Sequence, residues 1–301
     1  MNGTLSNHLA RSLCAACALF AGGIAQAENP ASICSSSARA IPARPDKATG
    51  ASEFVASIAD LGDRDRDLAI RRELLSGNLP AFLRQLLPTT LHARLPDGRG
   101  IELTLCVLSD YLGVGTDRDF IRMPMGLGSA LAVASRFGFT LPTRRIVDHI
   151  YRQASVQLLP QPLPAGERMR SLAYLQRHDA LISQQRVARG ASLGTLTAGH
   201  KKDLVLSARL WQQPGRVAIY GWQRADGTPI QPLSTVHGAQ YADYSHGVRL
   251  VSQTVFVDGR PASIFDVLAD AQLGPLLSDE GPLPSAGRWQ AGHAAPDAPR
   301  D

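Results

Sequence analysis

Two cysteines, Cys34 and Cys106, restrict the fold of this chain more than any other residues, because a bond between them would close a long loop. The remaining cysteines, Cys14 and Cys17, belong to an N-terminal segment that we expect to be removed, which leaves an even pair. An even pair in an exported protein is typical of a disulfide. We therefore predict a Cys34–Cys106 bond that fastens the polar segment around Cys34 to the first strand. A nucleophilic role for either thiol is less favoured, because neither lies beside a histidine or a helix start.

Residues 1–27 show the parts of a secretory signal peptide in the expected order. Arg11 precedes an apolar run from Leu13 to Ile24, and Ala25-Gln26-Ala27 is a cleavage site of the small-x-small type. The run is about 12 residues long, whereas a bilayer span needs about 20, and no later segment has about 18 uninterrupted apolar residues. We therefore predict a secreted or periplasmic protein with no transmembrane segment after signal cleavage.

The composition excludes two broad classes of protein. Hydrophobic residues make up 44% of the 301 residues and the formal net charge is only +5, so the chain can form a core and is not intrinsically disordered. The lysines are confined to Lys47, Lys201 and Lys202, and the arginines are not clustered with aromatic residues. We therefore expect no nucleic acid among the partners of the protein.

Hydrophobic periodicity predicts an α+β protein whose character changes along the chain. The helical N-terminal half contains a short hairpin, with strands at 89–95 and 101–107 around an Asp97-Gly98 turn. The C-terminal half has strand patterns at 204–211, 217–222 and 247–257, which predict a mainly antiparallel sheet plus one helix. Thr143 and Ser263 are placed to cap helices.

The same patterns divide the chain into segments of different kinds. We expect a signal peptide at 1–27, a flexible arm at 28–51, a single α+β globular domain at 52–284 and a disordered tail at 285–301. A sub-boundary within the domain would fall at the Pro-rich connector 158–166 or near residue 190, where the strand patterns begin.

Two segments hold most of the groups that carry chemistry. The first is Gly199-His200-Lys201-Lys202-Asp203, directly before an apolar strand, and the second runs from Gln231 to Arg249. Strand ends hold side chains rigidly, so we expect His200 and Asp203 at one edge of a sheet. The next strands return to the same edge, which would bring His237 and His246 close to them. The sequence therefore predicts one polar pocket formed by the two segments.

The residue types in this predicted pocket suit two kinds of chemistry. Three imidazoles, from His200, His237 and His246, could bind Zn²⁺, which accepts nitrogen ligands in tetrahedral geometry. Alternatively, the imidazoles could do acid–base work without a metal, with Asp203 orienting one of them. Supporting groups would donate to an oxyanion or hold a carboxylate or phosphate, namely Tyr241, Tyr244 and Arg249. A structural role is the third interpretation, because the spacing matches no strong zinc signature.

Part of the second segment resembles the active-site signature of L,D-transpeptidases, secreted enzymes that cross-link peptidoglycan. That signature has a His-Gly pair and then Ser-His-Gly-Cys and an arginine, and this chain has His237-Gly238 and then Ser245-His246-Gly247-Val248-Arg249. Val248 stands at the position of the nucleophilic cysteine, and the gap between the two parts is shorter than in that family. Without a thiolate the covalent mechanism is lost, so the resemblance implies no catalytic role for these residues.

These features favour a secreted hydrolase-like protein that acts on a polar polymer outside the cytoplasm, such as cell-wall peptide or glycan. In this hypothesis the His/Asp/Tyr groups of the two segments react with the substrate, with or without zinc. The alternative hypothesis is a non-catalytic secreted binding or envelope protein that uses the same loop as a recognition surface.

Overall fold

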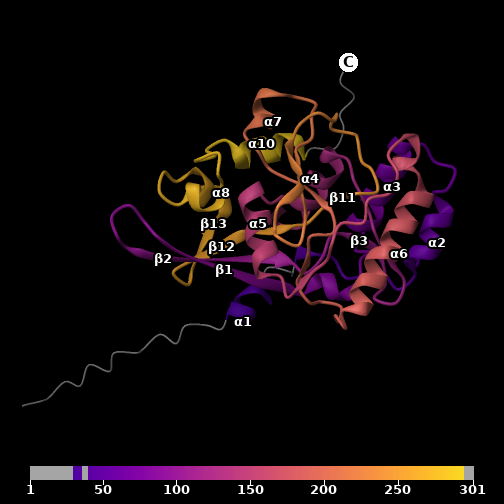
Figure 1. Ribbon diagram of the computed structural model, residues 1–301, viewed down its shortest axis with the longest axis horizontal. Coiled ribbons are helices and arrows are strands. Elements are labelled where there is room, and N and C mark those ends of the chain that lie inside the picture. Colours follow the sequence, from indigo (N-terminus) through magenta and orange to yellow (C-terminus); the bar gives the residue numbers. More distant parts are fainter. Residues whose placement is uncertain (1–29, 36–39, 295–301) are drawn as a thin grey trace, which may run out of the picture.

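The computed structural model describes residues 30–35 and 40–294 (Figure 1). The predicted signal peptide lies outside the described residues, as do parts of the predicted arm and tail. Within the described part of the chain, no helix has the length and apolar character needed to cross a membrane.

Helices occur along the whole described chain, alternating with strands. The α-helices are α1 (Pro30–Ser35), α2 (Ala51–Ser57), α3 (Asp63–Leu75), α4 (Leu127–Arg136), α5 (Arg144–Gln153), α6 (Leu172–Ala188), α7 (Arg209–Gln212), α8 (Ile264–Ala269), α9 (Gly274–Leu277) and α10 (Ala286–His293). Two 3-10 helices are η2 (Ala81–Arg84) and η3 (Glu167–Arg170). The strands are β1 (Leu86–Arg94), β2 (Gly100–Leu108), β3 (Gly113–Gly115), β4 (Phe120–Arg122), β5 (Phe139–Thr140), β6 (Val156–Gln157), β7 (Thr197–Ala198), β8 (Lys202–Leu204), β9 (Ile219–Gln223), β10 (Pro229–Ser234), β11 (His246–Gly247), β12 (Val251–Val257) and β13 (Arg260–Ser263).

The predicted division into a helical N-terminal half and a C-terminal sheet with one helix is wrong. The largest sheet has five strands in the order β1-β2-β12-β13, with β5 added on β12, so it joins both halves of the chain. Antiparallel pairing places Val255 of β12 opposite Leu105 of β2. Since β2 has a partner on each side, most of its side chains are buried, whereas the turn of the β1–β2 hairpin projects from the body (Figure 1). The chain is therefore a mixed α/β structure with mostly antiparallel sheets.

A second sheet positions the residues predicted to carry chemistry. Its four strands have the order β10-β9-β8-β11. The pair β8–β11 is parallel and places His246 opposite Lys202, and Gly247 opposite Asp203. The two sequence segments predicted to meet therefore do lie side by side as backbone. Two-stranded pairs β3–β4 and β6–β7 complete the strand pairing of the described residues.

The predicted strand at 204–211 is wrong beyond its first residue, because it coincides with β8 only at Leu204. β8 ends at Leu204, and the chain then turns into α7. The Glu280 carboxylate accepts hydrogen bonds from Ser207 Oγ at 2.9 Å and from the Ala208 N–H at 3.1 Å, which fixes the turn. The two predicted helix caps are confirmed, since Thr143 Oγ1 accepts from the Ile146 N–H and Ser263 Oγ accepts from the Phe265 N–H.

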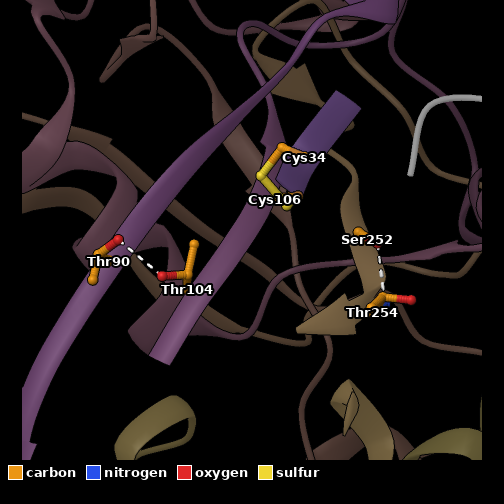
Figure 2. Close-up of a disulfide and its surroundings, with 6 residues drawn as sticks. All are labelled: Cys34, Thr90, Thr104, Cys106, Ser252 and Thr254. Atoms are coloured by element: carbon orange, nitrogen blue, oxygen red, sulfur yellow. Dashed lines mark hydrogen bonds between the residues drawn. A yellow bond between two sulfur atoms is a disulfide. The ribbon is translucent and has the colours of Figure 1, made fainter. Parts of the chain in front are cut away.

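The predicted disulfide is confirmed. Cys34 of α1 and Cys106 of β2 are bonded, and both residues are fully buried (Figure 2). On the same hairpin, the Thr90 and Thr104 hydroxyls are joined across the strands at 3.0 Å (Figure 2). A buried disulfide is consistent with folding in an oxidising compartment.

Helix α10 lies within the segment for which we predicted disorder. Gln290 is buried in this helix, where its amide donates to the Phe139 carbonyl at 2.9 Å and accepts from the Thr140 hydroxyl at 2.7 Å. Ala286 also belongs to the main apolar cluster, which contains Cys34 from the other end of the described chain. The part of this segment up to residue 293 is therefore packed against the body.

Candidate functional site

A cavity of about 700 Å³ opens among the described residues, and we call it the arginine cavity. Its walls come from α3, the start of α4, the turn after α7, the loop 239–241 and α10. Its charged lining consists of four arginines and two aspartates, namely Arg64, Arg71, Arg170, Arg216, Asp63 and Asp67. The cavity therefore has an excess of positive charge.

One face of α3 forms a wall of the arginine cavity. Arg64, Asp67, Leu68 and Arg71 all line it, and their spacing of three, four and seven residues places them on one side of a helix. The guanidinium groups of Arg64 and Arg71 form no ion pair with any described residue. These two cations are therefore available to a ligand.

The two aspartates of the arginine cavity are already engaged. Asp67 accepts from the Gly126 N–H at 2.8 Å and from Ser129 Oγ at 2.6 Å, so its charge lies at the N-terminus of α4. Asp63 is paired with Arg170 at 2.7 Å and with Arg66 at 2.6 Å. The positive end of α4 is therefore neutralised from within the protein, and the uncompensated positive charge comes from side chains.

Tyr241 connects the arginine cavity with the histidines of the predicted site. Its ring lies parallel to that of His237, with 4.0 Å between centroids, and its edge contact with His246 has a centroid distance of 5.6 Å. The Tyr241 hydroxyl donates to the Asp243 carboxylate at 3.2 Å. We call these four residues, His237, Tyr241, Asp243 and His246, the loop cluster.

The charges of the loop cluster follow from burial. Burial raises the pKa of Tyr241 to about 12, with a further contribution from the Asp243 charge. Burial also lowers the pKa of His246 to about 4 and lowers the pKa of His237. Burial acts to raise the pKa of Asp243, but the neighbouring His246 and the Ser245 hydrogen bonds outweigh it and lower that pKa. At neutral pH the cluster therefore holds one carboxylate, a protonated phenol and two neutral imidazoles.

His200 and Asp203 belong to a different, buried set of contacts. His200 Nε2 lies 3.0 Å from the Asp110 carboxylate, which also binds Arg122 at 2.6 Å. Burial lowers the pKa of His200. Asp203 accepts from the Tyr111 hydroxyl at 2.8 Å, and burial raises its pKa to about 7. Both side chains are sealed from solvent, so neither is exposed to a ligand at the surface.

Tyr244 and Arg249 likewise bind backbone groups in the interior. The Tyr244 hydroxyl accepts from the Leu163 N–H at 2.7 Å and donates to the Leu163 carbonyl at 3.2 Å. Arg249 donates to the carbonyls of Leu108 at 2.7 Å and Thr197 at 2.5 Å, and its guanidinium lies 4.4 Å from the centre of the Tyr111 ring. These contacts use the donor groups that we assigned to a substrate.

The predicted zinc ligands are not gathered around one point. The rings of His237 and His246 are 6.1 Å apart, whereas His200 is bound to Asp110. Among residues 30–35 and 40–294, no three His, Cys, Asp or Glu side chains are arranged to hold a metal ion. The zinc hypothesis gains no support from this arrangement.

Sequence reasoning located part of this site and missed the rest. Of the residues nominated from the sequence, Tyr241 lines the arginine cavity, and His237 and His246 contact the Tyr241 ring. Arg64 and Arg71 of α3 were not nominated from the sequence, although both line the arginine cavity. The signal that could have found them is the helical spacing of Arg64, Asp67, Leu68 and Arg71.

Comparison with known proteins does not identify a family. No family model, curated protein or solved structure matches the chain.

Proposed function

We propose that this protein is a secreted or periplasmic binding protein that holds an anionic part of a polar ligand, such as a fragment of cell-wall glycan or peptide, in the arginine cavity. The observation that carries the proposal is the cavity itself, which has more arginines than aspartates in its lining. An arginine fork binds a carboxylate or phosphate through paired hydrogen bonds, and this pairing gains strength in a partly enclosed site.

The size and lining of the arginine cavity also support binding. Its volume of about 700 Å³ falls within the usual range for small-ligand sites. The lining also contains apolar side chains, including Leu68, Leu131 and Leu210, so it suits a ligand with both an anionic and an apolar part. The Cys34–Cys106 disulfide supports the assignment to an oxidising compartment.

A calorimetric titration tests the proposal. The probes are soluble muropeptides, a galacturonic acid disaccharide and a glutamate dipeptide, each at low ionic strength. We expect at least one probe to bind. The Arg71→Gln variant should bind that probe about tenfold more weakly or worse, because a charge-assisted hydrogen bond between the arginine and the ligand anion is lost. Arg94→Gln, on the distant β1–β2 hairpin, is the matched control and should leave binding unchanged. Absence of binding, or equal affinity for the Arg71 variant, would refute the proposal.

A hydrolase that uses the loop cluster is the second candidate. The observation that favours it is Tyr241, which lines the arginine cavity while contacting His237 and Asp243. A neutral imidazole can accept a proton at neutral pH, and a protonated phenol can donate one.

Chromatography of the probes after incubation with the protein tests this second candidate. Cleavage products that form with the native chain should decrease about a hundredfold or more in His237→Ala and in Tyr241→Phe, while binding is retained. If no products form with the native chain, the hydrolase hypothesis is wrong and the binding proposal is unaffected.

A further inference from the structure

We infer that the ligand class of the arginine cavity is an acidic sugar, held by its ring against an aromatic stack and by its carboxylate against arginine. This inference rests on the proposed binding function and names its ligand. The stack consists of Trp211, Trp289 and His293. Trp211 and Trp289 are nearly parallel, with an angle of 10° and a centroid distance of 5.1 Å. His293 stacks on Trp289 at 4.4 Å with an angle of 26°.

The stack belongs to the arginine cavity through α10. Trp289 and His293 are spaced four residues apart on that helix, and both line the cavity together with Leu210, the neighbour of Trp211 on α7. Trp289 is half-buried and His293 is exposed, so part of each ring can meet a ligand. Trp289 and His293 thus line the same cavity as the arginines, and Trp211 packs against Trp289 from α7.

The orientation of the stack is held by the protein. His293 Nδ1 donates to the Trp289 carbonyl at 2.8 Å, which fixes the imidazole over its helical neighbour. The interlocked rings lose little conformational freedom when a ligand binds, because their positions are set beforehand. This arrangement is a rigid platform for a flat ligand surface.

The polar edges of the stack also match a sugar. Neither Trp211 nor Trp289 donates its indole N–H to an acceptor among the described residues, and neither indole nitrogen is buried without a partner. Sugar rings combine apolar C–H surfaces with hydroxyl groups that accept hydrogen bonds, so they fit an amphipathic indole. A simple inorganic anion would use the arginines but leave this platform unused.

The arginines of the cavity favour a ligand that carries a negative charge. Arg64, Arg71 and Arg216 line the same cavity and have no carboxylate partner among the described residues. A neutral sugar would leave these cations without a counter-charge, whereas a sugar carboxylate would pair with one of them. The structure therefore favours a uronic or muramic acid type of ring over a neutral ring.

Tryptophan fluorescence titration of the full chain tests this inference. The chain has only 3 tryptophans, two of which are in the stack, so stacking of a ligand should change the emission. The probes are digalacturonic acid, its dimethyl ester, which keeps the rings but not the charge, and a glutamate dipeptide, which keeps the charge but not the rings. We expect the acid to bind at least about tenfold more tightly than either of the other two.

Variants separate the contributions of stack and charge. His293→Ala should weaken binding of digalacturonic acid about threefold to tenfold without weakening binding of the glutamate dipeptide. His92→Ala, an exposed histidine on β1, is the matched control and should have no effect. Trp289→Phe keeps an aromatic ring and should retain most of the affinity, which checks that the helix still packs.

Two results would overturn the inference, and they differ from failure of the proposed function. If the glutamate dipeptide binds as tightly as the disaccharide, the cavity binds anions but the sugar assignment is wrong. If the dimethyl ester binds as tightly as the acid, the carboxylate requirement is wrong. If no probe, including muropeptides, binds at all, the proposed binding function itself fails.

Discussion

His178 is buried without a hydrogen-bond partner for either ring nitrogen among the described residues. It lies edge-on to Tyr244 at a centroid distance of 4.9 Å and to Trp222 at 6.0 Å. Burial lowers its pKa to about 2, so the ring is neutral and its polar atoms are left unsatisfied. An unsatisfied buried polar group costs about 1–3 kcal/mol.

Replacing His178 by Phe should therefore stabilise the protein. The aromatic contacts are kept while the unsatisfied nitrogens are removed, so we expect the free energy of unfolding to rise by about 1–2 kcal/mol. Urea unfolding at pH 7 measures the change. The neighbouring Asp179→Asn is the contrasting variant and should destabilise the fold, because Asp179 pairs with buried Arg122 at 2.9 Å. A lower stability of His178→Phe would contradict this account.

The Asp203 carboxylate makes a second prediction at this scale. Burial raises its folded-state pKa to about 7, above the ordinary value near 4, so it favours folding while protonated and loses that advantage as the pH rises through 7. Asp203→Asn imitates the protonated form. We expect its stability relative to the native protein to improve from pH 4 to pH 8 by a few kcal/mol, on the order of 1.4 kcal/mol per pKa unit. Thermal unfolding across this range checks it, and a pH-independent difference would argue against it.

At the scale of elements, local sequence patterns predicted individual turns and helix starts, but they did not predict how distant strands pair. Asp97-Gly98 predicted the β1–β2 hairpin, and Thr143 and Ser263 predicted helix starts, because turn and cap chemistry acts within a few residues. The alternation of apolar and polar residues within β2 does not indicate which distant strand pairs with it. In the structure that partner is β12, which comes from the other half of the chain. The fold class was wrong for this reason.

The Cys34–Cys106 disulfide connects helix α1 to the five-stranded sheet. Removing this bond tests how much the attachment of α1 contributes to the free energy of unfolding. We expect Cys34→Ser combined with Cys106→Ser to lower the free energy of unfolding by about 2–5 kcal/mol, because the loop between these residues is long. Guanidinium unfolding measures the loss. A reducing agent should lower the stability of the native protein and leave the double variant unchanged. Equal stability of both forms would show that α1 contributes nothing through this bond.

The candidate site was partly predictable for a related reason. The loop cluster gathers residues close in sequence, so His237, Tyr241 and His246 were found together. His200 was expected among them because β8 and β11 are neighbours, which is correct for the backbone. Its side chain instead binds Asp110, on the segment after β2, and no local pattern predicts that contact.

At the scale of the whole molecule, buried neutral imidazoles predict acid sensitivity. Burial lowers the pKa of His149 and His246 to about 4 each. The unfolded chain therefore binds more protons than the folded one below about pH 6.5, so stability falls as the pH falls toward 4. Asp148 and Asp203, whose pKa values are raised, act in the opposite direction over this range. The histidines with lowered pKa values among the described residues outnumber these two aspartates, namely His149, His178, His200, His237 and His246. We expect the melting temperature to decrease between pH 6.5 and pH 4, as differential scanning calorimetry would show, and a constant value would contradict this account.

The arginine cavity also belongs to the whole molecule, since its walls come from α3, α4, α10 and two loops that are far apart in the chain. The most direct test of its role is a crystal structure of the protein with digalacturonic acid bound. We predict a sugar carboxylate within hydrogen-bond distance of Arg71 or Arg216 and a sugar ring against Trp289 or His293. Ligand bound elsewhere on the surface, with the arginine cavity occupied only by water, would contradict the account.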